Sequence, residues 1–349
     1  RNTVPILSNV LLSAEGDRLT ITATDLDVEA FDVAMARIDQ PGSVTAPAQT
    51  LFDVVRKLPS GADIELELQS DNERLVLRSG RSRFALPTLP ASDFMTLSAD
   101  AGGVEFELAA ADLKRLIEKT KFAMSTEETR YYLNGIYLHI VENEDAVLLR
   151  AVATDGHRLA LAEMHAPAGT EALPGMIIPR KTVNELRRLV DSYDGAVHIR
   201  ASDSKITCQL GNTRLTSKLI EGNFPEYSRV IPLANERKLV IDTKAFESAV
   251  DRVSTVSTER SRSVKLSLDL GKLSVSVNHA DTGHGNEEIE ADYTSEAMEV
   301  GFNAKYLLEL ASQIEAKEAH FLLSDPASPA LVLDPEDAAT RYVLMPLRV

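Results

Sequence analysis

The sequence predicts an α+β protein made of three copies of one unit, each with two helices packed on antiparallel sheets. The first observation is internal repetition: residues 21–26 (ITATDL) match residues 151–156 (AVATDG), and residues 80–84 (GRSRF) match residues 211–215 (GNTRL), 130 and 131 positions further on. The second is apolar and polar alternation with the period of a strand, and the third is apolar stripes with the period of a helix. Two helices against an antiparallel sheet form a layered α+β architecture.

The repetition divides the chain into three predicted domains, at residues 1–103, 104–236 and 237–349. The tail at 340–343 (TRYV) resembles residues 213–216 (TRLT), which places a third copy at the C-terminal end. Each copy has about 110 to 130 residues, an ordinary domain size. The chain begins inside an apolar run without an initiator Met, so we expect the first strand and first helix of domain 1 to be missing.

Copy two shows the predicted elements in order. Residues 104–108 alternate as a strand, a helix follows, strands run through residues 135–164, and Pro179 precedes a second helix. Hairpin strands at 197–200 and 205–210 close the unit. The apolar stripes of the helices are Leu113, Leu116, Ile117 and Thr120, then Val183, Leu186, Leu189 and Val190, in copy two; Phe246, Ala249, Val250 and Val253, then Leu307, Leu310, Ala311 and Ile314, in copy three; and Leu51, Val54, Val55 and Leu58 in copy one.

Composition sets the broad class of the protein. With 44% hydrophobic and 26% charged residues, the 349-residue chain is expected to be a soluble globular protein of more than one domain. A single cysteine excludes an intrachain disulfide framework and a cysteine-based metal cluster. We see no apolar run long enough to span a membrane and no signal sequence, so we expect a cytoplasmic protein without a membrane partner. The net charge of -16 does not describe how the charges are distributed.

Residues 153–160 (ATDGHRLA) form the most distinctive stretch, because they place a turn, two charges and an imidazole between two β-rich runs. Asp155 and Gly156 are typical of a tight hairpin turn. Three interpretations are open. Asp155 and His157 could perform acid-base catalysis, although no further catalytic group stands in a recognisable motif nearby. Asp155 could simply cap the turn, with His157 and Arg158 at a hairpin edge, or the turn could form one wall of a surface pocket.

Basic residues gather on the predicted helices, whereas acidic residues crowd strands and loops. In the second helix of copy two, Arg180, Lys181, Arg187 and Arg188 fall on one face, opposite the apolar stripe. A basic face seen once is most often only solvated, but its recurrence on equivalent helices indicates a surface that follows phosphates. The other basic positions are Lys114, Arg115, Lys119 and Lys121 in copy two and Arg56 and Lys57 in copy one.

Four motifs resemble the bacterial sliding clamps, the beta subunits of DNA polymerase III. They are RYYLNG at 130–135, ATDGHRLA at 153–160, FPEY at 224–227 followed by Arg229 and Val230, and the terminus YVLMPLRV. The resemblance implies a head-to-tail homodimeric ring of six similar domains, in which helices line the hole and sheets lie outside. It also implies no catalytic activity, no cofactor and no metal; such a ring holds polymerase on double-stranded DNA.

The resemblance also implies three sets of site residues. A pocket between the second and third domains takes short linear peptides from the DNA polymerase III alpha subunit, the clamp loader and repair or translesion polymerases. Its wall would be Leu133, Thr154, Gly156, His157, Arg158, Leu159, Pro225, Arg229, Val230, Val343, Met345, Pro346, Leu347 and Arg348. Contacts to DNA would come from Arg1, Tyr131, Tyr132, Arg56, Lys57, Lys114, Arg115, Arg180, Lys181, Arg187 and Arg188, and contacts between subunits from Phe84, Leu86, Thr255 and Val256.

The chain departs from the family's pattern in three places. The first helix of copy one is absent from this sequence, so Arg1 is its first residue. Glu127 stands where the family can place a neutral side chain that contacts DNA, which predicts a weaker contact there. Thr255 is more polar than the aliphatic residue that the family can carry, which predicts a looser dimer.

Two functions from other classes compete with this interpretation. An enzyme would use His157 with Asp155, or a metal held by His279 and His284, although the spacing of these histidines fits no helical ligand pair. A monomeric scaffold that binds peptides without DNA differs from a clamp in whether the protein dimerises.

Overall fold

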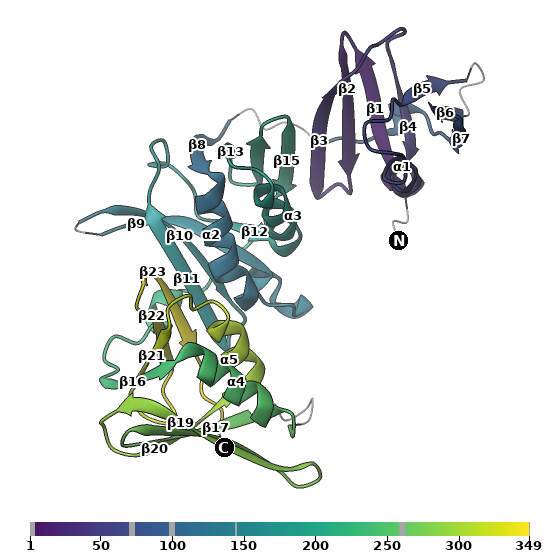
Figure 1. Ribbon diagram of the computed structural model, residues 1–349. Coiled ribbons are helices and arrows are strands. Elements are labelled where there is room, and N and C mark those ends of the chain that lie inside the picture. The colour runs from purple at the N-terminus through teal and green to yellow at the C-terminus, as the bar shows by residue number, and fades with distance from the viewer. Residues whose placement is uncertain (1–3, 70–73, 98–101, 144, 258–262, 349) are drawn as a thin grey trace. The chain divides into compact units, whose positions relative to one another are not determined.

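The computed structural model describes residues 4–69, 74–97, 102–143, 145–257 and 263–348 (Figure 1). Its contacts divide the chain into two compact units. The first unit comprises residues 1–110, 168–172 and 188–219, and the second comprises residues 111–167, 173–187 and 220–349. Arg1, one of the predicted DNA contacts, lies outside the described residues.

The first unit is built on an antiparallel eight-stranded sheet in the order β4-β1-β2-β3-β15-β14-β13-β8, with a separate three-stranded sheet β5-β6-β7. Its strands are β1 (Asn9–Glu15), β2 (Arg18–Thr24), β3 (Val28–Met35), β4 (Gly42–Pro47), β5 (Glu65–Leu68), β6 (Arg74–Ser79), β7 (Ser82–Pro87), β8 (Val104–Ala109), β13 (Ala196–Ala201), β14 (Lys205–Leu210) and β15 (Thr213–Lys218). β3 pairs with β15, so strands of predicted domains 1 and 2 share one sheet.

The second unit is built on an antiparallel twelve-stranded sheet in the order β12-β9-β10-β11-β23-β22-β21-β16-β19-β18-β17-β20. Its strands are β9 (Gly135–Glu142), β10 (Val147–Thr154), β11 (Arg158–His165), β12 (Met176–Pro179), β16 (Arg237–Asp242), β17 (Ser263–Asp269), β18 (Lys272–His279), β19 (Gly283–Tyr293), β20 (Met298–Asn303), β21 (Glu318–Leu323), β22 (Ala330–Asp334) and β23 (Asp337–Leu344). The pairing of β11 with β23 joins predicted domains 2 and 3.

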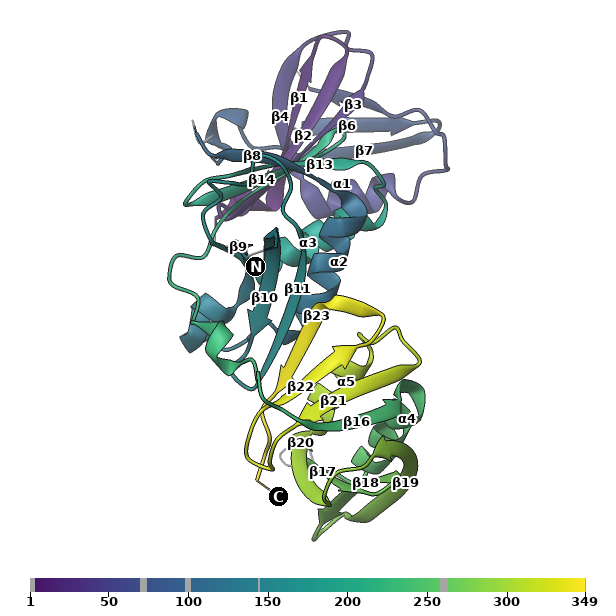
Figure 2. The same cartoon turned by 90° about the vertical axis from the view of Figure 1, so that its left-hand side faces the viewer.

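The described helices confirm the two-helix unit in copies two and three. They are α1 (Ala48–Val55), α2 (Ala110–Thr120), α3 (Arg180–Asp191), α4 (Thr243–Ser254) and α5 (Ala304–Ala311), with short 3-10 helices η1 (Pro5–Ser8), η2 (Ala91–Asp93), η3 (Lys121–Ala123), η4 (Glu128–Leu133) and η5 (Tyr227–Val230). α4 packs on α5 and on β18 and β19, as Figures 1 and 2 show. Asp242 and Asn303 cap the first turns of α4 and α5 by accepting backbone N–H groups.

The predicted apolar stripes of copies two and three are largely buried. Leu116 and Leu186 are each 1% exposed, as is Phe246, so burial of these stripes follows the helical period read from the sequence. The stripe of α1 is the least buried, and Val55 is 38% exposed. Together with the antiparallel sheets, this confirms the α+β class.

The compact units do not coincide with the three repeats. At each junction between copies, a strand of one copy pairs with a strand of the next. β3 of copy one pairs with β15 of copy two, and β11 of copy two pairs with β23 of copy three. Such pairing satisfies backbone groups that would otherwise stand open at a sheet edge. The boundaries at residues 103 and 236 therefore stay a prediction about repeats. None of the helices in the described ranges is long and apolar enough to cross a membrane.

Candidate functional site

The turn between β10 and β11 is fixed by its own side chains. The Asp155 carboxylate accepts the backbone N–H groups of His157 and Arg158 at 2.9 and 3.0 Å. The Thr154 hydroxyl accepts the Gly156 N–H at 3.1 Å and donates to the Arg158 carbonyl at 2.6 Å. Gly156 has a φ of +88°, which a residue with a Cβ adopts only with strain. Asp155 therefore caps a rigid hairpin turn, as one of the three interpretations predicted.

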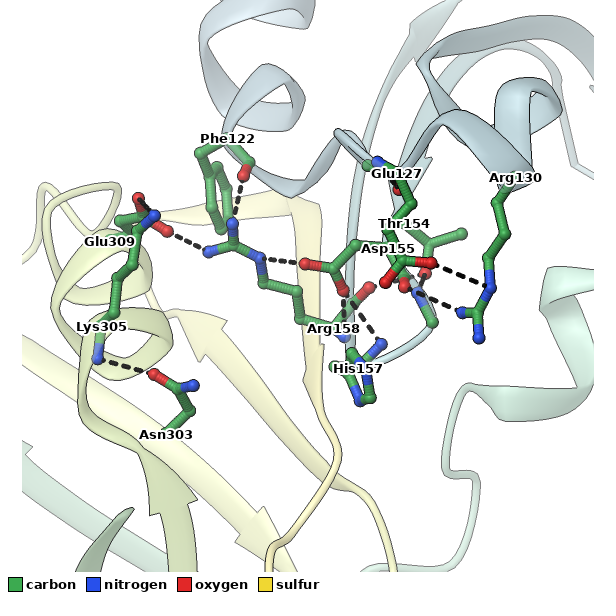
Figure 3. Close-up of polar contacts among 12 residues, drawn as sticks. Phe122, Glu127, Arg130, Thr154, Asp155, His157, Arg158, Asn303, Lys305 and Glu309 are labelled. Atoms are coloured by element: carbon green, nitrogen blue, oxygen red, sulfur yellow. Dashed lines mark hydrogen bonds and ion pairs between the residues drawn. The ribbon is translucent and has the colours of Figure 1, made fainter. Parts of the chain in front are cut away.

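Arg158 is not at a hairpin edge, and that expectation was wrong; its assignment to the pocket rim stays a prediction. β11 lies between β10 and β23, and Arg158 is 7% exposed. Its guanidinium donates to Asp155 at 3.1 Å, to Glu309 of α5 and to the Phe122 carbonyl at 2.5 Å (Figure 3). It also lies 4.2 Å from the centre of the Tyr306 ring. Sequence spacing could not show that a second strand and α5 would cover this side chain.

The C-terminal residues meet the hairpin turn, as the pocket prediction requires. The Met345 N–H donates to the His157 carbonyl at 2.9 Å, and the Leu347 N–H donates to the Gly301 carbonyl at 2.8 Å. These bonds fix the backbone, while the Met345 and Leu347 side chains remain 37% and 38% exposed. Pro346 is half-buried between them, and Arg348 is exposed.

An apolar cluster lies on one face of the joined sheet and includes two of the predicted pocket residues. Leu159 and Val343 pair across β11 and β23, and both belong to a buried group with Val152, Leu161, Leu331 and Tyr227. Tyr227 comes from the segment that carries Pro225, Arg229 and Val230, all of which are exposed. Leu133 is 4% exposed in η4 and is not part of that group. The structure thus gathers most of the predicted wall from three separate stretches of chain.

A second site lies at the start of α3. An open cleft of about 470 Å³ is lined by Tyr131, Asn134, Pro179, Arg180, Lys181, Asn184 and Ile220. Tyr131 is 56% exposed and contacts the half-buried Tyr132 edge-on at 5.7 Å between ring centres. The backbone N–H of Arg180 donates to the Asn134 carbonyl at 2.9 Å, which ties the end of η4, the short helix that carries both tyrosines, to the start of α3. One exposed aromatic ring and two cations therefore share one concave surface.

Comparison with known proteins matches three domains of one family along the chain, in the order of the three predicted repeats. The DNA polymerase III beta subunit family matches residues 1–98 with its N-terminal domain, residues 107–226 with its central domain and residues 228–348 with its C-terminal domain. The chain belongs to the DNA polymerase III beta subunit family, the bacterial sliding clamps. The predicted resemblance is confirmed.

The chain matches individual relatives over nearly their whole length. The beta sliding clamp of Caulobacter vibrioides NA1000 is 54% identical over 349 residues, which are 100% of this chain and 94% of that protein; the clamp of Escherichia coli K12 is 39% identical over 352 residues, with the same coverage. A crystal structure of the Caulobacter crescentus clamp with bound PEG has a TM-score of 0.97 at 54% identity and covers 100% and 93% of the two chains. The Bartonella birtlesii clamp bound to griselimycin has a TM-score of 0.97 at 50% identity, covering 100% and 94%.

Sliding clamps are processivity factors without catalytic activity, so the enzymatic interpretation of His157 and Asp155 is set aside on family membership. The other rival used the histidines of the β18–β19 hairpin. There, His279 accepts the Asp281 N–H at 3.3 Å, and His284 pairs with Asn278. Across the described ranges, no group of three or more His, Cys, Asp or Glu residues is placed to hold a metal ion.

Several basic residues of the predicted helix faces, two of them predicted DNA contacts, have partners within the chain. Arg115 donates twice to Asp337 of β23, at 2.7 and 2.9 Å. Lys119 is 7% exposed and bonds to Glu315 and to the Gln313 carbonyl, both at 2.7 Å, so its expected place on an open basic face was wrong. Arg187 pairs with Glu118 of α2 at 2.6 Å. The cations of α2 thus hold the helix to the C-terminal strands and loops.

The predicted subunit contacts differ in their exposure. Phe84 is 36% exposed, but Leu86 is 5% exposed and belongs to the core, because it lies opposite the buried Leu75 on β6. Thr255 is exposed just after α4, and the Val256 carbonyl accepts the Thr282 hydroxyl. Residues 258–262, next to these positions, lie outside the described residues.

Sequence reasoning missed a polar and aromatic group beneath residues 224–230. It consists of Tyr137 and His139 on β9, Arg150 on β10, Glu163 on β11 and Tyr227. Burial, followed by the nearby Arg150 charge, lowers the pKa of His139 from 6.5 to about 4, so the imidazole is neutral near pH 7. The one available signal was the alternation of Tyr137 and His139, which places both rings on one face of a strand.

Proposed function

We propose that two copies of this chain close head-to-tail into a ring that encircles double-stranded DNA and holds the replicative polymerase on it. The observation that carries the proposal is the meeting of the hairpin turn with the C-terminal residues, which leaves Met345 and Leu347 exposed on a rigid support. Apolar side chains in such a position are typical of a protein-binding surface. The three matched domains supply the parts of half a ring.

The peptide site we propose has three apolar anchors, Met345, Leu347 and Val230, of which Val230 is 45% exposed. Leu159 and Val343 form its buried floor, and exposed Arg229 and Arg348 supply charges for the polar ends of a peptide. The His157 carbonyl holds the Met345 backbone, and its imidazole contributes packing, not proton transfer. We assign to this site the DNA polymerase III alpha subunit, the clamp loader and repair or translesion polymerases as partners.

The DNA contacts we propose begin at the cleft lined by Tyr131, Arg180 and Lys181. An aromatic ring beside two cations suits a nucleic acid backbone and base edge, and such contacts weaken as salt rises. Tyr132, Lys114, Arg187, Arg188, Arg56 and Lys57 stay candidate contacts. Arg115 also stays a candidate, with its guanidinium held by Asp337 as that of Arg187 is held by Glu118.

The subunit contact we propose joins Phe84 of one copy to the Thr255 and Val256 region of the other. Leu86 supports the strand from inside the core. A head-to-tail contact closes into a ring when the rotation between neighbouring copies completes a full turn, and we take two copies from the family. We also infer a cytoplasmic location, where bacterial replication takes place.

Sedimentation velocity at micromolar concentration tests the ring, together with titration of a fluorescein-labelled peptide derived from the DNA polymerase III alpha subunit. We expect a dimer that binds the peptide. A monomer that still binds the peptide would support the rival scaffold without DNA. A dimer that binds neither the peptide nor griselimycin, the ligand of the Bartonella birtlesii clamp, would overturn the peptide site.

A further inference from the structure

The segment at residues 224–230 (FPEYSRV) lies between β15 and β16 and brings three residues to the proposed peptide site. All of it is described, and its regular structure is limited to the short 3-10 helix η5. Pro225, Arg229 and Val230 are exposed along it. A connecting segment outside the sheet ladder depends on side-chain contacts for a fixed position.

Aromatic rings hold the segment to β9. Phe224 stacks on Tyr137 with ring centres 4.8 Å apart and planes at 9°, and Tyr137 stacks on His139 at 4.3 Å and 18°. Tyr227 then meets His139 edge-on at 5.6 Å and Phe224 edge-on at 6.4 Å. Two rings of the segment and two rings of the strand therefore enclose one another. Gly175 permits this arrangement, because a Cβ there would lie 2.3 Å from the Tyr137 hydroxyl.

The Tyr227 hydroxyl adds a directional contact below the rings. Tyr227 is only 8% exposed, and its hydroxyl accepts a hydrogen bond from Arg150 Nη1 at 3.0 Å. His139 Nε2 lies 2.9 Å from the same oxygen. Burial, then the Arg150 charge, keeps His139 neutral by lowering its pKa to about 4. The hydroxyl thus has two partners on two different strands.

Arg150 is itself fixed, so it holds the hydroxyl from a firm base. Its guanidinium pairs with Glu163 at 2.7 and 2.8 Å, with side-chain exposures of 12% and 10%. The other oxygen of Glu163 faces Arg341 of β23 at 3.5 Å. The chain of contacts runs from the segment across β9, β10 and β11 to β23, which is where the central and C-terminal repeats join.

We propose that Tyr227, His139, Arg150 and Glu163 are positioning residues of the peptide site. They fix residues 224–230 on the sheet in advance, so that Val230 and Arg229 meet the peptide without first being ordered. The inference rests on the proposed peptide site. A site whose wall is already in place avoids the entropy cost of ordering it on binding, and its affinity is higher for that reason.

The test removes one oxygen atom. Tyr227→Phe keeps the ring stack and deletes the contacts to Arg150 and His139. The matched control is Tyr293→Phe, because Tyr293 is 1% exposed and its hydroxyl donates to the Glu296 carbonyl at 2.6 Å, away from the segment. Both variants are compared with wild type by thermal melting, by titration of the labelled polymerase peptide and by amide hydrogen exchange of the free protein.

We expect similar small losses of melting temperature in both variants. Only Tyr227→Phe should raise the peptide Kd, by about three- to tenfold, and speed amide exchange in residues 227–231 of the free protein. Equal peptide affinity in Tyr227→Phe and wild type would overturn the positioning role. So would weaker peptide binding with unchanged exchange in the segment, because that pattern indicates a lost direct contact.

A second variant guards against misfolding of the first. His139→Phe keeps the stack with Tyr137 and removes the nitrogen beside the hydroxyl, and we expect the same pattern with a smaller effect. Its failure to change either readout would also count against the proposal. If wild type does not bind the peptide at all, the peptide site itself is wrong; if wild type binds and no variant weakens it, only the positioning role is wrong.

Discussion

Replacing Arg158 with Met tests whether a buried arginine joins the central and C-terminal repeats. The guanidinium is 7% exposed and meets Asp155, Glu309 and the Phe122 carbonyl. The Met side chain fills much of the space between the Phe122 and Tyr306 rings. It leaves the carboxylates of Asp155 and Glu309 without their cation. Breaking a buried pair by removing one partner typically costs about 3 to 5 kcal/mol.

Because Glu309 is 34% exposed and water can solvate it, we expect the lower end, a loss of about 3 kcal/mol of unfolding free energy. For a unit of the size of the second compact unit, this loss corresponds to a fall in melting temperature of about 6 to 12 °C. The assay is differential scanning calorimetry at pH 7. Lys265→Met is the matched control, because its pair with Glu299 at 2.9 Å is solvent-exposed and such pairs contribute little. A melting temperature for Arg158→Met equal to that of Lys265→Met would refute the cross-link.

Three further predictions concern the same unit. Leu347→Ala should weaken polymerase peptide binding about thirtyfold by removing an anchor, measured by fluorescence titration, and an unchanged Kd would exclude Leu347. His139 has a pKa of about 4 in the folded protein against 6.5 in the unfolded chain, so the unfolded chain binds more protons between these two pH values. The free energy of unfolding should therefore fall by up to about 3 kcal/mol as the pH drops from 6.5 to 4. Urea denaturation measures this dependence of stability on pH, and His139→Phe should flatten it. Gly156→Ala should cost about 1 to 2 kcal/mol because of the φ of +88°, and no change in melting temperature would show that the turn relaxes.

The sequence predicted what depends on local pattern. The helix stripes, the strands of copy two and the Asp155 turn follow from residues close together in the chain, where period and turn chemistry decide the structure. The contact between the hairpin and the C-terminus came from the family resemblance, because nothing in the spacing indicates that β11 pairs with β23.

What the sequence could not supply is the surroundings of each side chain. Spacing placed Lys119 and Arg115 off the apolar stripe of α2, but it could not show that Glu315 and Asp337, about two hundred residues later, would come to meet them. The family resemblance assigned Leu86 to the subunit contact, and spacing alone could not show that pairing with β6 buries its side chain within its own subunit. Long-range pairing, not helix or strand propensity, decides these cases.

Retention on DNA tests the central claim most directly. The protein, loaded by its clamp loader with ATP onto a nicked circular duplex, is passed over a gel-filtration column before and after the circle is cut once. A ring predicts that protein elutes with the circular DNA and is lost when the same DNA becomes linear, since its own contacts with phosphates are weak in physiological salt. Equal retention on circular and linear DNA, or release from both, would contradict encirclement.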